Sequence, residues 1–460
     1  MTFFEGGMAE MKKMELMEGE GFSSPSCLLP SLEGLEEIKP GMLATRIVNR
    51  AMRQASGKYL SLRPIDRDRL PAPREGKHYL LYAHVPFCST LCTYCTFNRF
   101  LFEEEKARRY FRSLRQEMKM AYELGYRFDS MYVGGGTTSI LVDELCATID
   151  LARELFPLKE VSCESDPNNI DKETMAHLKG RVDRISVGVQ SFDDDILKRV
   201  GRYEKFGGGE ETLSKLQALM GALPVVNIDL IFNFPTQDEK MLRRDLEIIK
   251  RLSPTQVTAY PLMSSPSVKS LIKRSIGDIS LDKEATLYRV ILEELLGEYN
   301  QISSWAFSKK GDDIIDEYVV NHDEYVGIGS GSFSFLDGVL YTNTFSLKEY
   351  ATRIESGKMG LSRARKYGRL SQMQYRLMVG LFGGGVHKES FSRQFKMPIE
   401  VGLFKELLFL RCAGAIREKE GVLYPTLKGK YLFLSMMKEF YIGMDTVREE
   451  SRARLSSEDM

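Results

Sequence analysis

Apolar and polar residues in the middle of the chain follow two alternating patterns. Short apolar runs rich in β-branched and aromatic side chains predict buried strands, and longer segments with apolar residues at every third or fourth position predict amphipathic helices. Each predicted strand is followed by a predicted helix. The predicted strands cover residues 79–85, 129–136, 160–167, 184–192, 225–235 and 256–263.

This alternation predicts parallel strands joined by right-handed crossovers, in a closed or partial barrel or in a doubly wound sheet. In each of these folds the ligand site lies at the carboxyl ends of the strands. Three cysteines follow the first strand and three glycines end the second, while Glu164, Gln190 and Asp229 lie in or at the ends of the next three. A barrel with its site at the mouth brings all of these together.

The two flanks of this region have different patterns. Residues 1–40 show little periodicity, and a charged, proline-broken connector precedes the first strand. After residue 300, glycine- and serine-rich segments between short apolar runs predict one or two β-hairpins. We therefore predict four parts: an N-terminal extension and helix (1–76), the barrel (77–300), a glycine-rich β extension packed on the barrel (301–369) and a mainly helical C-terminal domain (370–460).

Composition narrows the class of protein. Lysine plus arginine and aspartate plus glutamate both total 64, so no broad basic field marks a nucleic-acid or anionic-membrane partner. The chain has no run of about 18 consecutive apolar residues and no apolar leader, so we expect neither a membrane span nor export. Seven cysteines without an export signal argue against a disulfide framework, and we expect a reducing, cytoplasmic location.

Three of the cysteines lie close together in the stretch HVPFCSTLCTYCTF. Cys88, Cys92 and Cys95 have the spacing CxxxCxxC, which lets the thiolates of one loop bind one metal centre. A cubane of four irons held by three thiolates keeps one iron open to another ligand. Zinc would need a fourth ligand; His84 could supply it, but we expect that side chain to form a hydrogen bond beneath the loop. The spacing therefore favours a [4Fe-4S] cluster.

CxxxCxxC resembles the cluster loop of the radical S-adenosylmethionine (SAM) enzymes. In that family the amino and carboxylate groups of SAM bind the open iron, and one-electron reduction cleaves SAM to a 5′-deoxyadenosyl radical. The segment YVGGGTTSI resembles the family's motif for the SAM amino group, and its glycines let the backbone approach a ligand. The resemblance implies a [4Fe-4S] cluster, SAM and a one-electron donor such as flavodoxin or ferredoxin.

More of the chain resembles one subgroup, the oxygen-independent coproporphyrinogen dehydrogenases and heme chaperones. The segments YAHVPFC, GGGTT, CESDP, VGVQSFDDDILKRVGR, DLIFNFP and YVGIGSGSFS follow one another in the order of that subgroup. The resemblance implies a partial (β/α)6 radical SAM barrel and, in the dehydrogenase branch, two SAM molecules side by side. It assigns Tyr82, Gly135, Glu164 and Phe333 to the cluster-bound SAM. It assigns Tyr94, Gly136, Thr137, Gln190, Arg202, Asp229 and Pro261 to a second SAM.

Two departures from this subgroup bear on function. The dehydrogenases carry a fourth cysteine two places after the third, where this chain has Phe97. The heme chaperones carry an HNxxYW motif, and the matching residues here are Ile314, Ile315, Tyr318 and Val319. Segments such as VGRYEKFGGGEE and YTNTFSL instead resemble a third branch, the anaerobic heme-degrading radical SAM methyltransferases, or anaerobilin synthases (the ChuW/HutW family).

This last resemblance predicts a radical SAM C-methyltransferase with heme as its substrate, which methylates heme, opens the ring and releases iron and a linear tetrapyrrole. The alternatives are an oxygen-independent coproporphyrinogen III dehydrogenase and a noncatalytic heme chaperone. His322 could be an axial heme ligand, although a solvated or capping histidine is the simpler interpretation.

Overall fold

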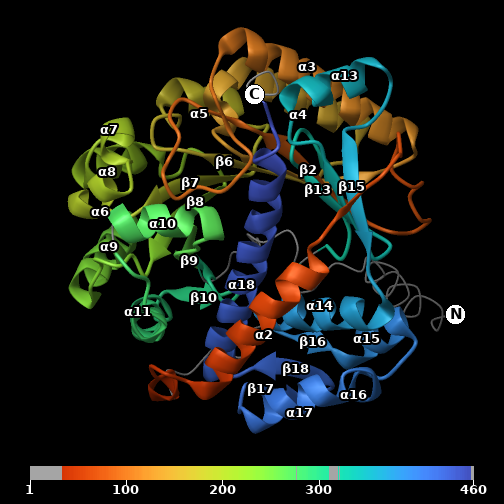
Figure 1. The fold of residues 1–460 in the computed structure, drawn as a ribbon. Helices are drawn as coiled ribbons and strands as arrows, with labels where there is room; N and C mark the ends of the chain where they lie inside the picture. Colours follow the sequence, from red (N-terminus) through yellow and green to blue (C-terminus); the bar gives the residue numbers. More distant parts are fainter. Residues whose placement is uncertain (1–33, 276, 310–319, 321, 457–460) are drawn as a thin grey trace, which may run out of the picture.

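The computed structural model describes residues 34–275, 277–309, 320 and 322–456. A mixed sheet of 13 strands forms its frame (Figure 1). The centre of this sheet is six parallel strands in the order β2-β5-β6-β7-β8-β9. They are β2 (Tyr79–Val85), β5 (Phe128–Gly135), β6 (Glu160–Ser165), β7 (Arg184–Gln190), β8 (Val225–Phe232) and β9 (Gln256–Pro261). All six predicted strands are confirmed, and most predicted ends run slightly past the observed ones.

Helices connect these strands, as the apolar periodicity predicted. Several begin where an aspartate or serine side chain accepts hydrogen bonds from the first free amides, as Asp171, Asp193, Asp238 and Ser280 do. Their apolar faces pack on the sheet and form the main core. The helices are α3 (Glu104–Glu123), α4 (Val142–Leu155), α5 (Lys172–Leu178), α6 (Asp194–Arg199), α7 (Tyr203–Phe206), α8 (Gly209–Leu219), α9 (Glu239–Leu252), α10 (Pro266–Ser275) and α11 (Leu281–Leu295).

The glycine-rich region extends the central sheet. Strand β12 pairs in parallel with β2, and β13, β14, β15 and β1 then continue the sheet in antiparallel order. At the other edge, β11 and β10 follow β9. In the described part of the chain β1 and β10 are the outer strands, so the sheet is open. Their bounds are β1 (Arg63–Pro64), β10 (Tyr299–Gln301), β11 (Ala306–Lys309), β12 (Tyr325–Ile328), β13 (Phe333–Leu336), β14 (Val339–Asn343) and β15 (Leu361–Lys366).

The C-terminal region is mostly helical, with one small sheet of order β16-β18-β17. Its last helix, α18 (Leu427–Arg452), starts at this small sheet and runs up through the middle of the molecule to the cluster loop, and α2 (Leu43–Tyr59) packs against it (Figure 1). The other elements are α13 (Leu347–Glu355), α14 (Arg369–Phe382), β16 (Val386–His387), α15 (Lys388–Phe395), α16 (Ile399–Gly402), α17 (Phe404–Cys412), β17 (Ile416–Lys419) and β18 (Val422–Pro425).

None of the helices in the described ranges has the combination of length and apolar character needed to cross a lipid bilayer.

Candidate functional site

The three clustered cysteines lie on a loop that follows β2 at the carboxyl edge of the sheet. Two short strands, β3 (Phe87–Cys88) and β4 (Phe100–Leu101), pair with each other and hold the two ends of the loop together. Within the loop, the Cys95 amide donates to the Cys92 carbonyl at 3.4 Å. Cys88 and Cys92 are buried and Cys95 is half-buried. The loop therefore turns all three thiols away from bulk solvent.

His84 supports this loop from below. Its Nε2 atom lies 2.8 Å from the Asn98 carbonyl oxygen, and its Nδ1 atom lies 3.0 Å from the Tyr82 hydroxyl. Burial lowers the pKa of His84 to about 4, so the ring is neutral near pH 7. The expected hydrogen bond beneath the loop is confirmed, and both ring nitrogens are engaged within the protein.

The electrostatic environment of the thiols suits a bound metal cluster. Burial raises the pKa of Cys88, and it raises the pKa of Cys95 to about 11, while the neighbouring Arg99 lowers both. A thiolate in such a buried place needs a bound cation, because desolvation disfavours its charge.

Two buried arginines beside the thiols have N–H groups that could bind an anionic group. The Arg202 Nη1 atom donates to Cys92 Sγ at 3.7 Å. The Arg202 Nε atom and the Arg99 Nε and Nη1 atoms are buried without hydrogen-bond partners among the described residues. Unused donors beside three thiols fit a thiolate-bound cluster and an anionic ligand next to it.

The thiols are not arranged for a single metal ion. In the described ranges, no three or more histidine, cysteine, aspartate or glutamate side chains are placed to hold one ion. A cubane cluster spans several ångströms, so its three ligands need not converge on one point.

The glycines at the end of β5 pack directly against the cluster loop. A Cβ atom at Gly136 would lie 2.4 Å from the Phe87 carbonyl oxygen and 3.0 Å from Cys88 Sγ, closer than any side chain can approach. Gly135 has a φ of +123°, which favours glycine. The Gly136 and Thr137 amides donate to the carbonyls of Val85 and Phe87 at 2.8 and 2.7 Å. Only glycines allow the second strand to support the cysteine loop this closely.

Three of the four residues assigned to the cluster-bound SAM form one contact group. The Glu164 carboxylate accepts hydrogen bonds from the Gly135 amide at 2.8 Å and from the Tyr132 hydroxyl at 3.0 Å. The Tyr132 ring stacks on Tyr82 with a centroid separation of 6.1 Å. The fourth residue, Phe333, lies on β13 and takes part in the contact with α18 described below. Tyr132 was missed from the sequence, although it lies in the quoted YVGGG segment.

The residues assigned to a second SAM lie around Arg202. Its Nη1 atom donates to the Tyr94 hydroxyl at 3.2 Å, and its Nη2 atom donates to the Gly188 carbonyl. Gly188 on β7 is the register partner of Asp229 on β8. The Asp229 carboxylate in turn accepts hydrogen bonds from Ser186 and Asn227 at 2.8 Å. Arg202, Tyr94 and these strand residues thus occupy one side of the mouth.

The other members of that set are less closely connected. Gln190 ends β7 with a φ of +76°, a backbone conformation that side-chain-bearing residues rarely adopt. The Thr137 hydroxyl donates to Asp166 at 2.7 Å, and Asp166 was also missed from the sequence. Pro261 ends β9, the outermost of the six parallel strands.

The last turns of α18 contact the cluster loop, which sequence reasoning missed entirely. The Arg448 guanidinium lies 4.9 Å from the centre of the Phe97 ring and 5.4 Å from that of Phe333, and donates to Asp445 at 2.6 Å. The Arg452 guanidinium donates to the carbonyls of Phe97 at 3.2 Å and Arg99 at 3.4 Å. The C-terminal helix therefore covers the cluster loop. These positions have no local signal, because the contact joins segments about 350 residues apart.

His322, which was considered as a heme ligand, does not lie at the mouth. His322 Nε2 lies 3.0 Å from Ser130 Oγ and 3.6 Å from Asp129 Oδ1, at the amino end of β5. The side chain is 17% exposed and contacts β5, so it is neither a solvated nor a capping histidine. The four residues matching the HNxxYW motif, together with Cys27, lie outside the described residues.

Comparison with known proteins shows which superfamily the barrel region resembles. The family model of the radical SAM superfamily matches residues 82–249. This part of the chain is therefore similar to the radical SAM superfamily, which uses a [4Fe-4S] cluster and SAM, and the site residues fit both.

Nearer relatives belong to one part of that superfamily. The chain is 26% identical to the heme chaperone HemW of Bacillus subtilis over 366 residues, which are 76% of this chain and 96% of that protein. It is 26% identical over 343 residues to the oxygen-independent coproporphyrinogen III oxidase of Paracoccus denitrificans, covering 69% of this chain and 76% of the oxidase.

A solved structure confirms the fold. The structure of coproporphyrinogen III oxidase (HemN) from Escherichia coli matches with a TM-score of 0.67 and 21% identity, covering 85% of this chain and 93% of the oxidase. The predicted α/β fold, a partial radical SAM barrel with a mainly helical C-terminal region, is thereby confirmed.

The predicted heme-degrading methyltransferase activity is wrong. The relatives are named heme chaperones and coproporphyrinogen III oxidases, and these names match the two alternatives instead. Of the segments behind the prediction, VGRYEKFGGGEE contains Arg202, and YTNTFSL runs from β14 to the start of α13. Neither segment determines what happens to a tetrapyrrole.

Proposed function

We propose that the chain is a heme chaperone that carries a [4Fe-4S] cluster and binds SAM. The match to HemW over 96% of that protein's length carries this proposal, since it includes the C-terminal region as well as the barrel. Phe97 supports it further. A coproporphyrinogen dehydrogenase would be expected to have a thiol at this position, and here an aromatic ring packs against Arg448 instead.

In this proposal Cys88, Cys92 and Cys95 would hold the cluster, which would provide one-electron chemistry beside bound SAM. Glu164 is already oriented by two hydrogen bonds, so its carboxylate can accept from an ammonium or ribose hydroxyl without reorganising. Tyr82, Gly135 and Phe333 complete the first SAM site.

A second SAM site is proposed around Arg202. The remaining donor of Arg202, its unpartnered Nε atom, can bind a carboxylate. Asp229, the register partner of Gly188, is held by Ser186 and Asn227. The residues proposed to line this second SAM are Tyr94, Gly136, Thr137, Gln190, Arg202, Asp229 and Pro261.

A coproporphyrinogen III oxidase is the second candidate. The shared fold over 93% of the Escherichia coli oxidase favours it. The grouping of Tyr94, Arg202 and Asp229 also favours it, because a heme carrier does not need a second SAM site.

One anaerobic experiment separates the two. The reconstituted full-length protein is incubated with SAM and a strong one-electron reductant, once with heme and once with coproporphyrinogen III. A chaperone binds heme stoichiometrically, passes it to an apo-acceptor protein and releases no carbon dioxide from coproporphyrinogen. Carbon dioxide together with protoporphyrinogen would establish the oxidase instead, and failure to bind heme would end the chaperone proposal.

A further inference from the structure

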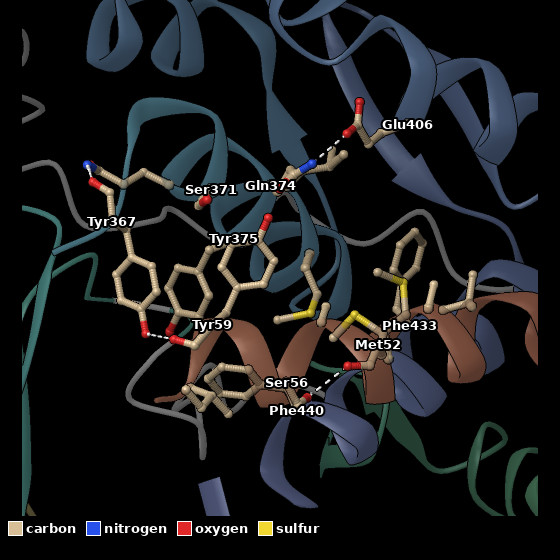
Figure 2. Close-up of a pocket in the computed structure, with 18 of the residues that line it drawn as sticks. Met52, Ser56, Tyr59, Tyr367, Ser371, Gln374, Tyr375, Glu406, Phe433 and Phe440 are labelled. Atoms are coloured by element: carbon tan, nitrogen blue, oxygen red, sulfur yellow. Dashed lines mark hydrogen bonds between the residues drawn. The ribbon is translucent and has the colours of Figure 1, made fainter. Parts of the chain in front are cut away.

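Two cavities lie next to each other between the central sheet and the C-terminal helices. The first has a volume of about 610 Å³ and lies between α2, the strands β12–β14, α14, α17 and α18 (Figure 2). The second has a volume of about 1070 Å³ and lies between the connector before β2, the β13–β14 turn, α14 and α15. Phe335, Gln372 and Tyr375 line both, so the two cavities share a wall. Neither is lined by a residue of the cluster loop.

The first cavity is apolar. Its walls are mainly aromatic and aliphatic side chains, including Tyr59, Phe440 and Met52 (Figure 2). Some polar groups at its edge already have hydrogen-bond partners within the protein. The Tyr367 hydroxyl, for example, donates to the Tyr59 carbonyl at 2.8 Å. The Tyr375 hydroxyl has no hydrogen-bond partner among the described residues. A cavity of this size and character suits a small molecule with a large apolar body.

The second cavity is polar and rich in cations. Six lysine and arginine side chains line it, against four aspartates and glutamates. Arg74, Lys77 and Arg376 are paired with these acids. Arg369, Arg393 and Lys396, by contrast, form no salt bridge within the part of the chain that the structure describes. This end of the paired cavities therefore has positive charge available for an anionic ligand.

We propose that the two cavities together form the heme seat, which deepens the function proposed above and rests on it. The macrocycle lies in the apolar cavity against Tyr59, Tyr375 and Phe440. The two propionates, which share one edge of the macrocycle, pass the common wall and meet Arg369, Arg393 and Lys396. Both features are needed, because the apolar cavity alone accepts many apolar molecules, whereas the cations beside it select a flat apolar molecule with carboxylates at one edge.

The inference is tested by titrating hemin into the full-length protein and following the Soret band. Ala55→Trp on α2 and Ser371→Trp on α14 fill the first cavity from opposite walls. Each should weaken hemin binding tenfold or more. Gln54→Trp, an exposed neighbour on α2 that does not line the cavity, is the matched control and should bind as the wild type does.

The cationic end has its own test. Replacing Arg369, Arg393 and Lys396 together by alanine should weaken hemin binding about tenfold, whereas replacing the exposed Arg112, Lys119 and Lys179 should leave it unchanged. Heme dimethyl ester, which lacks free carboxylates, should bind the wild type and the triple variant equally.

The outcomes distinguish this inference from the function on which it rests. If the wild type binds hemin but both tryptophan variants bind it equally well, heme lies elsewhere and the chaperone proposal stands. Equal loss of hemin and ester in the triple variant would also overturn the role of the cations. If the wild type binds no hemin, both proposals fail together.

Discussion

At the scale of single residues, the cluster cysteines allow the most direct prediction. The anaerobically reconstituted protein should be brown and contain about four irons per chain, and Cys92→Ala should lose most of both. Cys92 is buried and its sulfur accepts a hydrogen bond from Arg202, so we expect no other side chain to take its place as a cluster ligand. Cys412→Ala, which removes an exposed thiol, is the control and should keep its iron. Iron analysis and the visible spectrum measure the effect; an iron-replete Cys92→Ala protein contradicts the assignment.

Asp245 gives a second prediction at this scale. The carboxyl is buried on α9, accepts from Ser191 Oγ at 2.7 Å and the Phe192 amide at 2.9 Å, and has its pKa raised to about 7, mainly by burial. A carboxyl in the unfolded chain titrates near about 3.9. The folded state therefore holds this proton more tightly, and its contribution to stability is full below about pH 4 and is lost as the pH rises to about 7.

Asp245→Asn cannot titrate, so its free energy of unfolding should fall less than that of the wild type between about pH 5 and about pH 8. Urea unfolding at both pH values measures this difference. Asp150→Asn, an exposed carboxyl on α4, should leave the pH dependence as it is in the wild type. Parallel pH profiles for the wild type and Asp245→Asn would show that Asp245 is ionised in the folded protein.

At the scale of elements, α18 controls the surroundings of the cluster loop. The Arg448 guanidinium lies near both Phe97 and Phe333, and Phe333 is one of the proposed SAM contacts. Arg448→Ala should weaken SAM binding about tenfold, since a desolvated cation–aromatic contact contributes on the order of 1 to 2 kcal/mol. Arg448→Lys should restore only part of it, because lysine keeps the charge without the planar group.

Isothermal titration of the reconstituted protein with SAM measures this effect. Arg289→Ala, on α11, changes a half-buried ion pair within that helix and should bind SAM normally. Unchanged SAM affinity in Arg448→Ala would limit α18 to a structural role.

The strands and their pairing also show which parts of the fold could be predicted from the sequence. The six parallel strands were predictable because each carries its own short apolar run, and the cysteine and glycine motifs were predictable because their residues are neighbours in the chain. The pairing of β12 with β2 was not, because either strand could form a local hairpin. Glu117 illustrates the cause: on α3 it binds Gly329, Asn343, Tyr350 and Gly360, more than 200 positions away.

At the scale of the whole molecule, a buried ion pair joins the barrel to the C-terminal region. Lys438 of α18 donates to both carboxylate oxygens of Glu284 on α11 at 2.7 and 2.8 Å, and the two side chains are 4% and 0% exposed. Next to it, Arg53 of α2 makes a two-point contact with Glu439 at 2.7 and 2.8 Å. Helices α2 and α18 also line the proposed heme seat, so this junction should determine whether the seat is intact.

Removing one partner of the buried Lys438–Glu284 pair tests the role of this junction. Lys438→Met leaves the Glu284 carboxylate buried without its cation and should cost about 3 to 5 kcal/mol of stability. The double variant Lys438→Met/Glu284→Met replaces both charges with apolar side chains of similar length and should recover most of that loss. Trp305, the single tryptophan of the chain, reports on the junction, because it packs against Tyr260 of β9, Phe382 of α14 and Tyr441 of α18.

If the barrel and the C-terminal region unfold as one unit, Trp305 fluorescence and far-ultraviolet circular dichroism will give the same denaturant midpoint in the wild type. Both midpoints should then shift together in Lys438→Met. An early fluorescence transition with an unshifted dichroism transition would mean that the junction opens while the barrel stays folded. In that case the heme seat could form and disappear independently of the cluster site, and hemin affinity would fall in Lys438→Met while the iron content stayed constant.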